Sequence, residues 1–193
     1  LILSAFGVVG FAVFEGLNVL VLFDAFVLAI PLGHAIGRLG CLTYGCCHGV
    51  PSSKGPSITY ENPMAKACWS SGLKGVPLHP TQAYSALGNL AIFLLLNAVA
   101  ATGPLHAGVL SGLYLVVDSS ARFSMEFLRW PRRSESQLFK PYQWVAISFV
   151  AAGILMLVVS RGMPLVDFSD LGTFWRHLVD AAALAPWFGV AFL

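Results

Sequence analysis

Charge is what this sequence lacks most. Only 10% of its 193 residues are charged, 57% are hydrophobic, and the formal net charge is +2. A soluble domain of this size cannot cover its surface with so few charged side chains. No block of lysine and arginine is interleaved with aromatic residues, which excludes a nucleic-acid-binding surface. The composition therefore predicts an integral membrane protein that has membrane lipid as a partner and no nucleic-acid partner.

Apolar runs predict the spans of this protein. A membrane-crossing helix needs roughly 20 mostly apolar residues. The candidate segments are residues 1–14, 19–42, 81–101, 107–128 and 142–160. The first is short and begins inside an apolar run, so we expect further spans upstream. We predict an all-α integral membrane protein, a bundle of about five transmembrane helices, with residues 1–160 as the multi-span domain.

Two stretches are too polar to cross a membrane. Residues 47–80 contain five prolines, with several glycines and serines, and predict a small extramembrane cap. Residues 161–193 mix aspartates with phenylalanine and tryptophan. That mixture predicts an amphipathic C-terminal tail lying at the membrane surface.

A polar stripe enters the membrane on the fourth apolar segment. Its members recur every four residues and so share one helix face: Tyr114, Asp118, Arg122 and Glu126. In one interpretation the two carboxylates simply neutralise the arginine inside the bundle. In the other, Arg38 from another span joins Arg122 to hold an anionic lipid headgroup, since each guanidinium can grip a phosphate with two hydrogen bonds.

A second polar stretch, "LHPTQAY" at residues 78–84, lies where the cap re-enters the membrane. Pro80 and Thr81 are suited to starting a helix. That leaves His79, Gln82 and Tyr84 unexplained. A histidine at this level can exchange a proton near neutral pH, or it can be a hydrogen-bonded anchor.

Three stretches occur in the order of a known family. "GRLGCLTYGCCHG", "HPTQAY" and "ARFSMEFLRWP" resemble the patterns GRxGNFxNGExxG, HPSQLYE and GRFxxEFFRxPD of the prolipoprotein diacylglyceryl transferase family. The resemblance covers residues 20 to 160. It implies an enzyme of the bacterial inner membrane. Such an enzyme moves the diacylglyceryl group of phosphatidylglycerol onto the lipobox cysteine of a preprolipoprotein signal peptide, forming a thioether and releasing glycerol phosphate.

The resemblance also implies roles for individual residues. Arginines placed in advance stabilise the charge of the departing phosphate, and a base takes the proton of the attacking thiol. By position, the expected catalytic residues are Arg38, Arg122, Glu126 and His79. The expected substrate-binding residues are Arg38, Gly49, Gln82, Tyr84, Tyr114 and Asp118. We expect no cofactor and no metal ion.

The departures from the family patterns lie within the site. Cys41 and Tyr44 replace two asparagines, Cys46 replaces a glutamate, Asp118 replaces a tyrosine, and Ser85 follows Tyr84 in place of a glutamate. A histidine that the family uses upstream of the first motif has no match. The alternative function is therefore a non-catalytic lipid-binding membrane protein, or one that uses its cysteines for redox or metal chemistry.

The cysteines themselves have three interpretations. Cys41, Cys46, Cys47 and His48, with Cys68 as a further candidate, offer thiolate and imidazole ligands for zinc or copper, although their spacing is not that of a Cys-x2-Cys pair. In an oxidising compartment, Cys46 or Cys47 can form a disulfide with Cys68. Alternatively, the cysteines are small apolar residues that pack a helix end.

The charges and the resemblance predict opposite orientations. Seven lysines and arginines lie in the cap and in the link that follows Leu128. The positive-inside rule would place these loops in the cytoplasm. The resemblance places them on the periplasmic side with the tail in the cytoplasm, and we follow it because a basic rim suits an anionic-lipid site.

Overall fold

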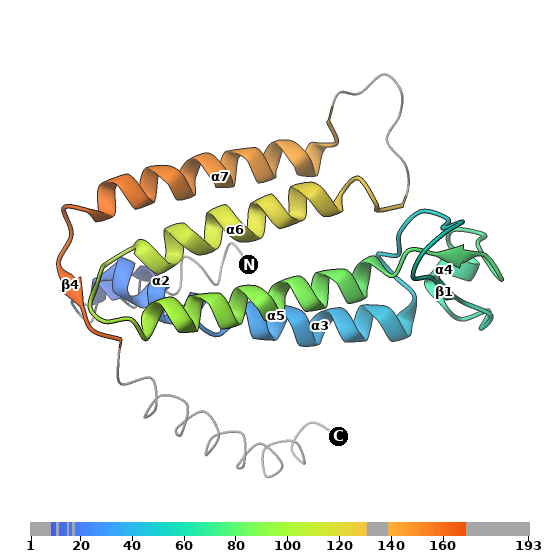
Figure 1. Cartoon of the computed structure of the whole chain (residues 1–193), viewed down its shortest axis with the longest axis horizontal. Coiled ribbons are helices and arrows are strands. Elements are labelled where there is room, and N and C mark those ends of the chain that lie inside the picture. The colour runs from blue at the N-terminus through green and yellow to red at the C-terminus, as the bar shows by residue number, and fades with distance from the viewer. Residues whose placement is uncertain (1–8, 11, 15, 17, 131–138, 169–193) are drawn as a thin grey trace, which may run out of the picture.

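The computed structural model describes residues 9–10, 12–14, 16, 18–130 and 139–168. Long helices lie side by side in the order α3, α5, α6, α7, and neighbours run in opposite directions (Figure 1). A shorter helix, α2 (Val19–Val27), packs at the end of the bundle where α6 begins. The long helices are α3 (Ile30–Tyr44), α5 (Thr81–Ala100), α6 (Val109–Met125) and α7 (Pro141–Ser160).

The helices confirm a membrane protein built mostly from α-helix. Helices α5 and α7, 20 residues each, are long and apolar enough to cross a membrane, and α2 with α3 can form a third, bent span. Many of their large hydrophobic side chains point outward, among them Leu87, Leu94 and Leu155. Helix α6 has 17 residues and carries the polar stripe. A count of five spans remains a prediction, because most of the first apolar segment lies outside the described residues.

The span predicted over residues 19–42 is broken near its middle. The segment is two helices, α2 and α3, that meet at a bend of 42°. Pro31 stands in the first turn of α3, where its missing N–H is tolerated. The carbonyl of Leu28 at the break accepts a hydrogen bond of 3.2 Å from the Asn97 side chain of α5. A neighbouring helix thus satisfies a backbone group that the break sets free.

A buried carboxylate joins α2 to α6. Asp24 is fully buried and lies at the N-terminus of α6. It accepts hydrogen bonds from the backbone N–H of Gly108 at 2.6 Å and of Ser111 at 2.7 Å, and from the Ser111 hydroxyl at 2.6 Å. These donors are groups that a helix start leaves unpaired. Asp24 therefore acts as a helix cap supplied by another element.

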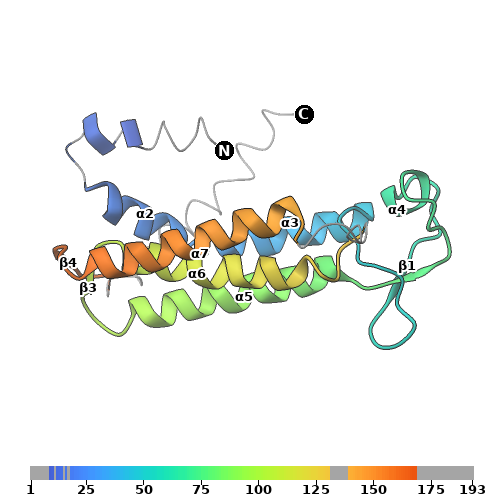
Figure 2. The ribbon, with the colours of Figure 1, turned by 90° about the horizontal axis from the view of Figure 1, so that it is seen from above.

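Two glycines set the close approach of α6 and α7, which lie side by side in both views (Figures 1 and 2). A Cβ at Gly153 would come within 2.8 Å of the Gly112 carbonyl oxygen. A Cβ at Gly112 would come within 2.9 Å of Leu157. Small residues at helix crossings are how membrane helices achieve tight backbone packing.

Short strands close both ends of the bundle. The cap end holds β1 (Ile58–Thr59), β2 (Pro77–Leu78) and the short helix α4 (Lys66–Trp69). The opposite end holds the antiparallel pair β3 (Leu105–His106) and β4 (Leu165–Val166). Residues 169–193, which include most of the predicted amphipathic tail, lie outside the described residues. The core at the β3–β4 end is formed by Val27, Leu28, Ile92, Leu96, Ala100 and Leu110.

Candidate functional site

The polar stripe of α6 forms as the sequence predicts, up to Arg122. The Nε of Arg122 donates to the Oδ2 of Asp118 over 2.6 Å, one helix turn away. Asp118 is buried, whereas the side chain of Arg122 is 46% exposed. Asp118 therefore fixes the inner edge of the guanidinium and leaves its terminal nitrogens for another partner.

The partner that reaches Arg122 is His34 of α3. Its Nδ1 lies 3.4 Å from Nη2 of Arg122 and 3.5 Å from the hydroxyl of Tyr114. A guanidinium can only donate, so Nδ1 accepts and the imidazole carries its proton on Nε2. His34 lies outside the three motifs and was not among the expected site residues. The available signal was its place one turn before Arg38, on the same helix face.

Arg38 lies one turn beyond His34 on α3 and is half-buried. Within the described part of the chain, no carboxylate forms an ion pair with Arg38. Of the two guanidiniums, that of Arg122 contacts the imidazole and holds the carboxylate of Asp118, and Arg38 lies one turn further along the helix that carries His34.

Glu126 faces a different set of partners. It is buried, and its carboxylate lies 3.2 Å from Nζ of Lys140 and 3.5 Å from Nη1 of Arg129. The same Lys140 amine donates to the backbone carbonyls of Glu126 and Arg129. These contacts join the end of α6 to the start of α7. Among the described residues, no side-chain hydrogen bond links Glu126 to Arg122.

Main-chain hydrogen bonds bring the three motifs together at the cap end. The N–H of Gly49 donates to the carbonyl of His79, and the N–H of Val50 donates to that of Leu128, both over 2.9 Å. Next to them, the N–H of Trp130 donates to the carbonyl of His48 over 3.1 Å. A Cβ at Gly49 would lie 2.6 Å from Cβ of His79 and 2.8 Å from the Leu128 carbonyl oxygen. Glycine is required at position 49 because two other segments of the chain, at His79 and Leu128, contact its backbone. This close packing explains the glycine without a contact to substrate.

Gln82 is a clamp between α5 and the end of α3. Its amide donates 2.7 Å to the carbonyl of Cys46 and 3.4 Å to the hydroxyl of Tyr60, and the side chain is 1% exposed. Thr81 donates to the carbonyl of Cys47 over 2.8 Å. Burial raises the pKa of Tyr60, whose hydroxyl donates to Leu42. The amide nitrogen of Gln82 is thus occupied inside the protein, whereas its buried Oε1 has no hydrogen-bond partner among the described residues.

His79 and Tyr84 lie on the rim of this junction. Their rings are 6.5 Å apart and tilted by 52°. His79 is half-buried, and its Nδ1 has no hydrogen-bond partner among the described residues. The backbone N–H of His79 donates to Val50, which holds the residue at the crossing.

All four cysteines are free. The thiol of Cys68 donates to the carbonyl of Tyr60 over 3.3 Å, inside the cap. The disulfide from Cys46 or Cys47 to Cys68 is therefore not formed in this structure. The other three thiols lie together at the end of α3.

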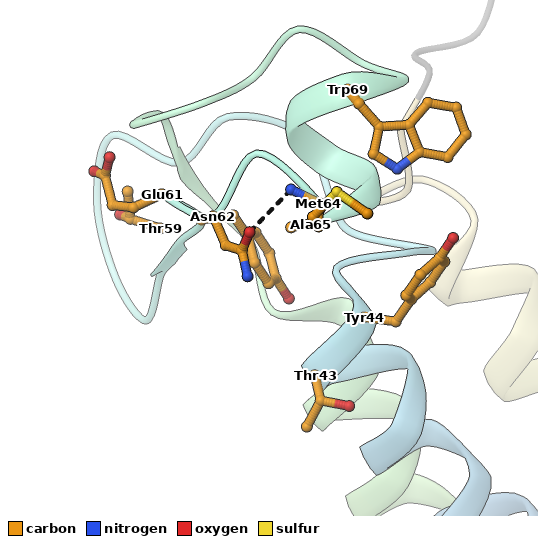
Figure 3. A pocket seen from close by; sticks show the side chains of 9 residues that line it. Thr43, Tyr44, Thr59, Glu61, Asn62, Met64, Ala65 and Trp69 are labelled. Carbon is orange, nitrogen blue, oxygen red and sulfur yellow. Dashed lines mark hydrogen bonds between the residues drawn. The ribbon is translucent and has the colours of Figure 1, made fainter.

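A pocket in the cap lies apart from the charged groups. Tyr44 and Trp69 lie on one side of it, and Thr59 and Glu61 lie on the other (Figure 3). Tyr44 and Trp69 are more than half exposed. None of the predicted site residues lines this pocket.

The family model for prolipoprotein diacylglyceryl transferase matches residues 1–159. The chain belongs to this family. All three resembling stretches fall within the matched range.

Individual diacylglyceryl transferases agree with the family match. The chain is 32% identical over 145 residues to phosphatidylglycerol–prolipoprotein diacylglyceryl transferase 2 of Clostridium perfringens. That alignment covers 75% of this chain and 54% of the relative. The enzyme of Clostridium tetani is 29% identical, over 75% of this chain and 55% of the relative. The enzyme of Chlorobaculum tepidum is 31% identical, over 72% and 46%. The chain thus spans about half the length of the curated relatives it matches.

Within this diacylglyceryl transferase family member, the expected site residues separate into two groups. Those of the α3–α6 face lie around His34: Arg38, Tyr114, Asp118 and Arg122. Gly49, Gln82 and Glu126 instead hold the motifs and helix ends together, through contacts with residues distant in the sequence. Sequence position alone did not separate these groups.

Proposed function

We propose that this protein transfers the diacylglyceryl group of phosphatidylglycerol to the lipobox cysteine of a preprolipoprotein. The observation that carries the proposal is the contact of Arg122 on α6 with His34 on α3, one turn before Arg38 on the same helix. Both come from membrane-inserted segments, where an arginine is costly unless it has a polar function. A phospholipid headgroup is an anion present at that depth.

The phosphate of the donor lipid is bound between the two arginines in this proposal. Arg122 is held by Asp118 through Nε, and its Nη2 faces His34. The remaining N–H groups of its terminal nitrogens can form charge-assisted hydrogen bonds to phosphate oxygens. Arg38 supplies a second fork. His34, with its proton on Nε2, supplies a further donor.

The reaction exchanges one bond on the glycerol carbon. The lipobox sulfur attacks the carbon that carries the phosphate ester, a C–S bond forms, and the C–O bond breaks. Its electron pair leaves with glycerol phosphate, and the arginines stabilise the charge that develops there. We assign the thiol proton to His79, whose Nδ1 lacks a partner among the described residues. Tyr84 beside it positions the ring.

Glu126 and Gln82 have positioning roles in this proposal. Glu126 holds the α6–α7 link through Lys140 and Arg129. Gln82 holds the end of α3 against the start of α5. Both roles act through the backbone and not through the lipid.

The decisive experiment measures transfer of labelled diacylglyceryl from phosphatidylglycerol to a lipobox peptide, by the mass shift of the peptide cysteine. The full-length protein is used in detergent. Arg38→Ala and Arg122→Ala should each lower the rate by about 100-fold or more, as removal of a charge-stabilising donor does. Arg161→Ala is the matched control, because Arg161 follows α7 at the opposite end and is exposed. Normal transfer by either site variant would refute the assignment, and phosphatidylglycerol binding without transfer by the parent protein would favour a lipid-binding role.

The orientation is proposed with the function. We place the protein in the bacterial inner membrane, with the cap and the link after Leu128 on the periplasmic side, where preprolipoproteins emerge. The cap and the end of α6 lie at the same end of the bundle, joined by the Val50–Leu128 hydrogen bond (Figure 2). A topology reporter fused after Arg161 should be cytoplasmic, and a periplasmic signal would reverse the orientation.

A further inference from the structure

Three thiols meet where α3 ends. Cys41 belongs to the last turn of α3, and Cys46 and Cys47 follow its C-cap. Their sulfur atoms all lie within 4.8 Å of one another. A metal ion bound to three sulfurs in a plane, with bonds of about 2.3 Å, holds those sulfurs about 4 Å apart. The thiols are therefore close to the spacing of a three-sulfur metal site before any ion binds.

The backbone that carries these thiols is held from two sides. Gly45 turns the chain in the left-handed region (φ 72°), and the N–H of Cys46 donates back to the carbonyl of Cys41 over 3.2 Å. The carbonyls of Cys46 and Cys47 accept the side chains of Gln82 and Thr81. Supporting contacts of this kind orient metal ligands in advance.

Cys47 has an unusual backbone conformation that bears on the direction of its side chain. Its φ is 56°, the only non-glycine residue with a positive φ in the described part of the chain. Such a conformation costs an ordinary residue on the order of 1 kcal/mol. It allows two adjacent cysteines, whose side chains would otherwise diverge, to direct their sulfurs toward Cys41.

The ligand set selects the ion. His48 is the nearest imidazole in sequence, but its Nδ1 faces the Gly49 carbonyl at 3.0 Å and its Nε2 faces the Ser71 hydroxyl at 3.1 Å. Within the described residues, the group of possible ligand atoms consists of the three sulfurs. Zinc in structural sites takes four ligands. Soft thiolates also select Cu(I), which is stable with three ligands.

We propose that Cys41, Cys46 and Cys47 form a binding site for a soft metal ion, and that Cu(I) in three-coordinate geometry is the ion it fits. Binding replaces each S–H bond by a metal–sulfur bond and releases the proton to solvent. No electron is transferred. The site lies beside the arginine face, since Cys41 follows Arg38 by three residues, and it does not depend on lipid transfer.

A competition titration tests the site. The reduced full chain in detergent, kept without oxygen, is titrated with Cu(I) in the presence of bicinchoninate, whose copper complex is coloured. One ion per chain should be withdrawn from the indicator. Each of Cys41→Ser, Cys46→Ser and Cys47→Ser should weaken binding at least about tenfold, and Cys68→Ser should match the parent chain. No withdrawal by the parent, or equal weakening by Cys68→Ser, would overturn the proposal.

A second measurement needs no variant. Iodoacetamide labelling of the native parent chain, counted by mass spectrometry, should show the three cluster thiols protected by Cu(I) and Cys68 unprotected. Equal labelling with and without Cu(I) rejects the site. Zn(II) serves as the comparison probe, and one-to-one zinc binding as tight as that of Cu(I) rejects the three-coordinate assignment.

Discussion

Gly49→Ala should unfold the junction at which the three motifs meet. The added methyl group would lie 2.6 Å from Cβ of His79, 2.7 Å from its carbonyl oxygen and 2.8 Å from that of Leu128. Carbon atoms in good contact lie about 3.5–4.0 Å apart. The overlap is therefore about 1 Å on two separate chain segments.

The expected loss of stability follows from these contacts. Overpacking of a tight site costs about 1–3 kcal/mol. Two of the three crowded atoms are backbone carbonyls that accept hydrogen bonds from Gly49 and Val50, so relief of the overlap weakens bonds worth about 1 kcal/mol each. We expect the free energy of unfolding to fall by about 2–4 kcal/mol. In a chain of this size that corresponds to a fall in Tm of about 4–16 °C.

Thermal unfolding in detergent, followed by circular dichroism, measures this loss. Gly37→Ala and Gly40→Ala are matched controls in the same motif, because a Cβ at either position meets nothing within 4 Å. Both lie inside α3, where alanine favours the helix by about 1 kcal/mol over glycine. The controls should melt at or above the parent temperature. A Gly49→Ala protein that melts with its parent would refute the close-packing argument.

Four further predictions concern other contacts. Asp24→Ala leaves the start of α6 without its cap and should lower the free energy of unfolding in mixed micelles by about 3–5 kcal/mol. Asp24→Asn should lose less, and equal stability of the parent and both variants would contradict the capping role. Gln82→Leu should cost about 1–3 kcal/mol in the same assay by leaving the carbonyl of Cys46 unpaired, and an unchanged midpoint would show that the clamp is dispensable. Gly153→Leu should part α6 from α7 and lower the melting temperature, whereas Gly88→Leu, at an open position of α5, should not. Burial, and after it the neighbouring thiols of Cys41 and Cys47, raises the pKa of Cys46 to about 12, so its alkylation in metal-free protein should rise about tenfold per pH unit from pH 7 to 10, and a plateau below pH 10 would contradict this.

Much of the helical framework could be predicted from hydropathy. The segments expected over residues 81–101 and 142–160 end within one residue of helices α5 and α7. The four-residue spacing correctly placed Tyr114, Asp118 and Arg122 on one face of α6. Both results depend only on local composition and on helix geometry, which a sequence displays directly.

The errors concern contacts between distant parts of the chain. The break after α2 is tolerated because the Asn97 side chain donates a hydrogen bond to the carbonyl of Leu28. No local feature of the sequence identifies Asn97 as that partner. His34 joins the site because α6 lies opposite α3. Glu126 lies on the same stripe as Arg122, but Lys140 of the next element engages it.

The cap that Asp24 supplies to α6 also constrains how the chain is made. Gly108, the first of its donors, follows Asp24 by 84 residues. At the usual pace of synthesis, about 5–20 residues per second, that separation corresponds to about 4–17 seconds. Throughout this interval the carboxyl group is in a nascent chain without its final donors. The contact that joins α2 to α6 can therefore form only after α6 has been made, so α2 reaches its final place in the bundle later than its position in the sequence suggests.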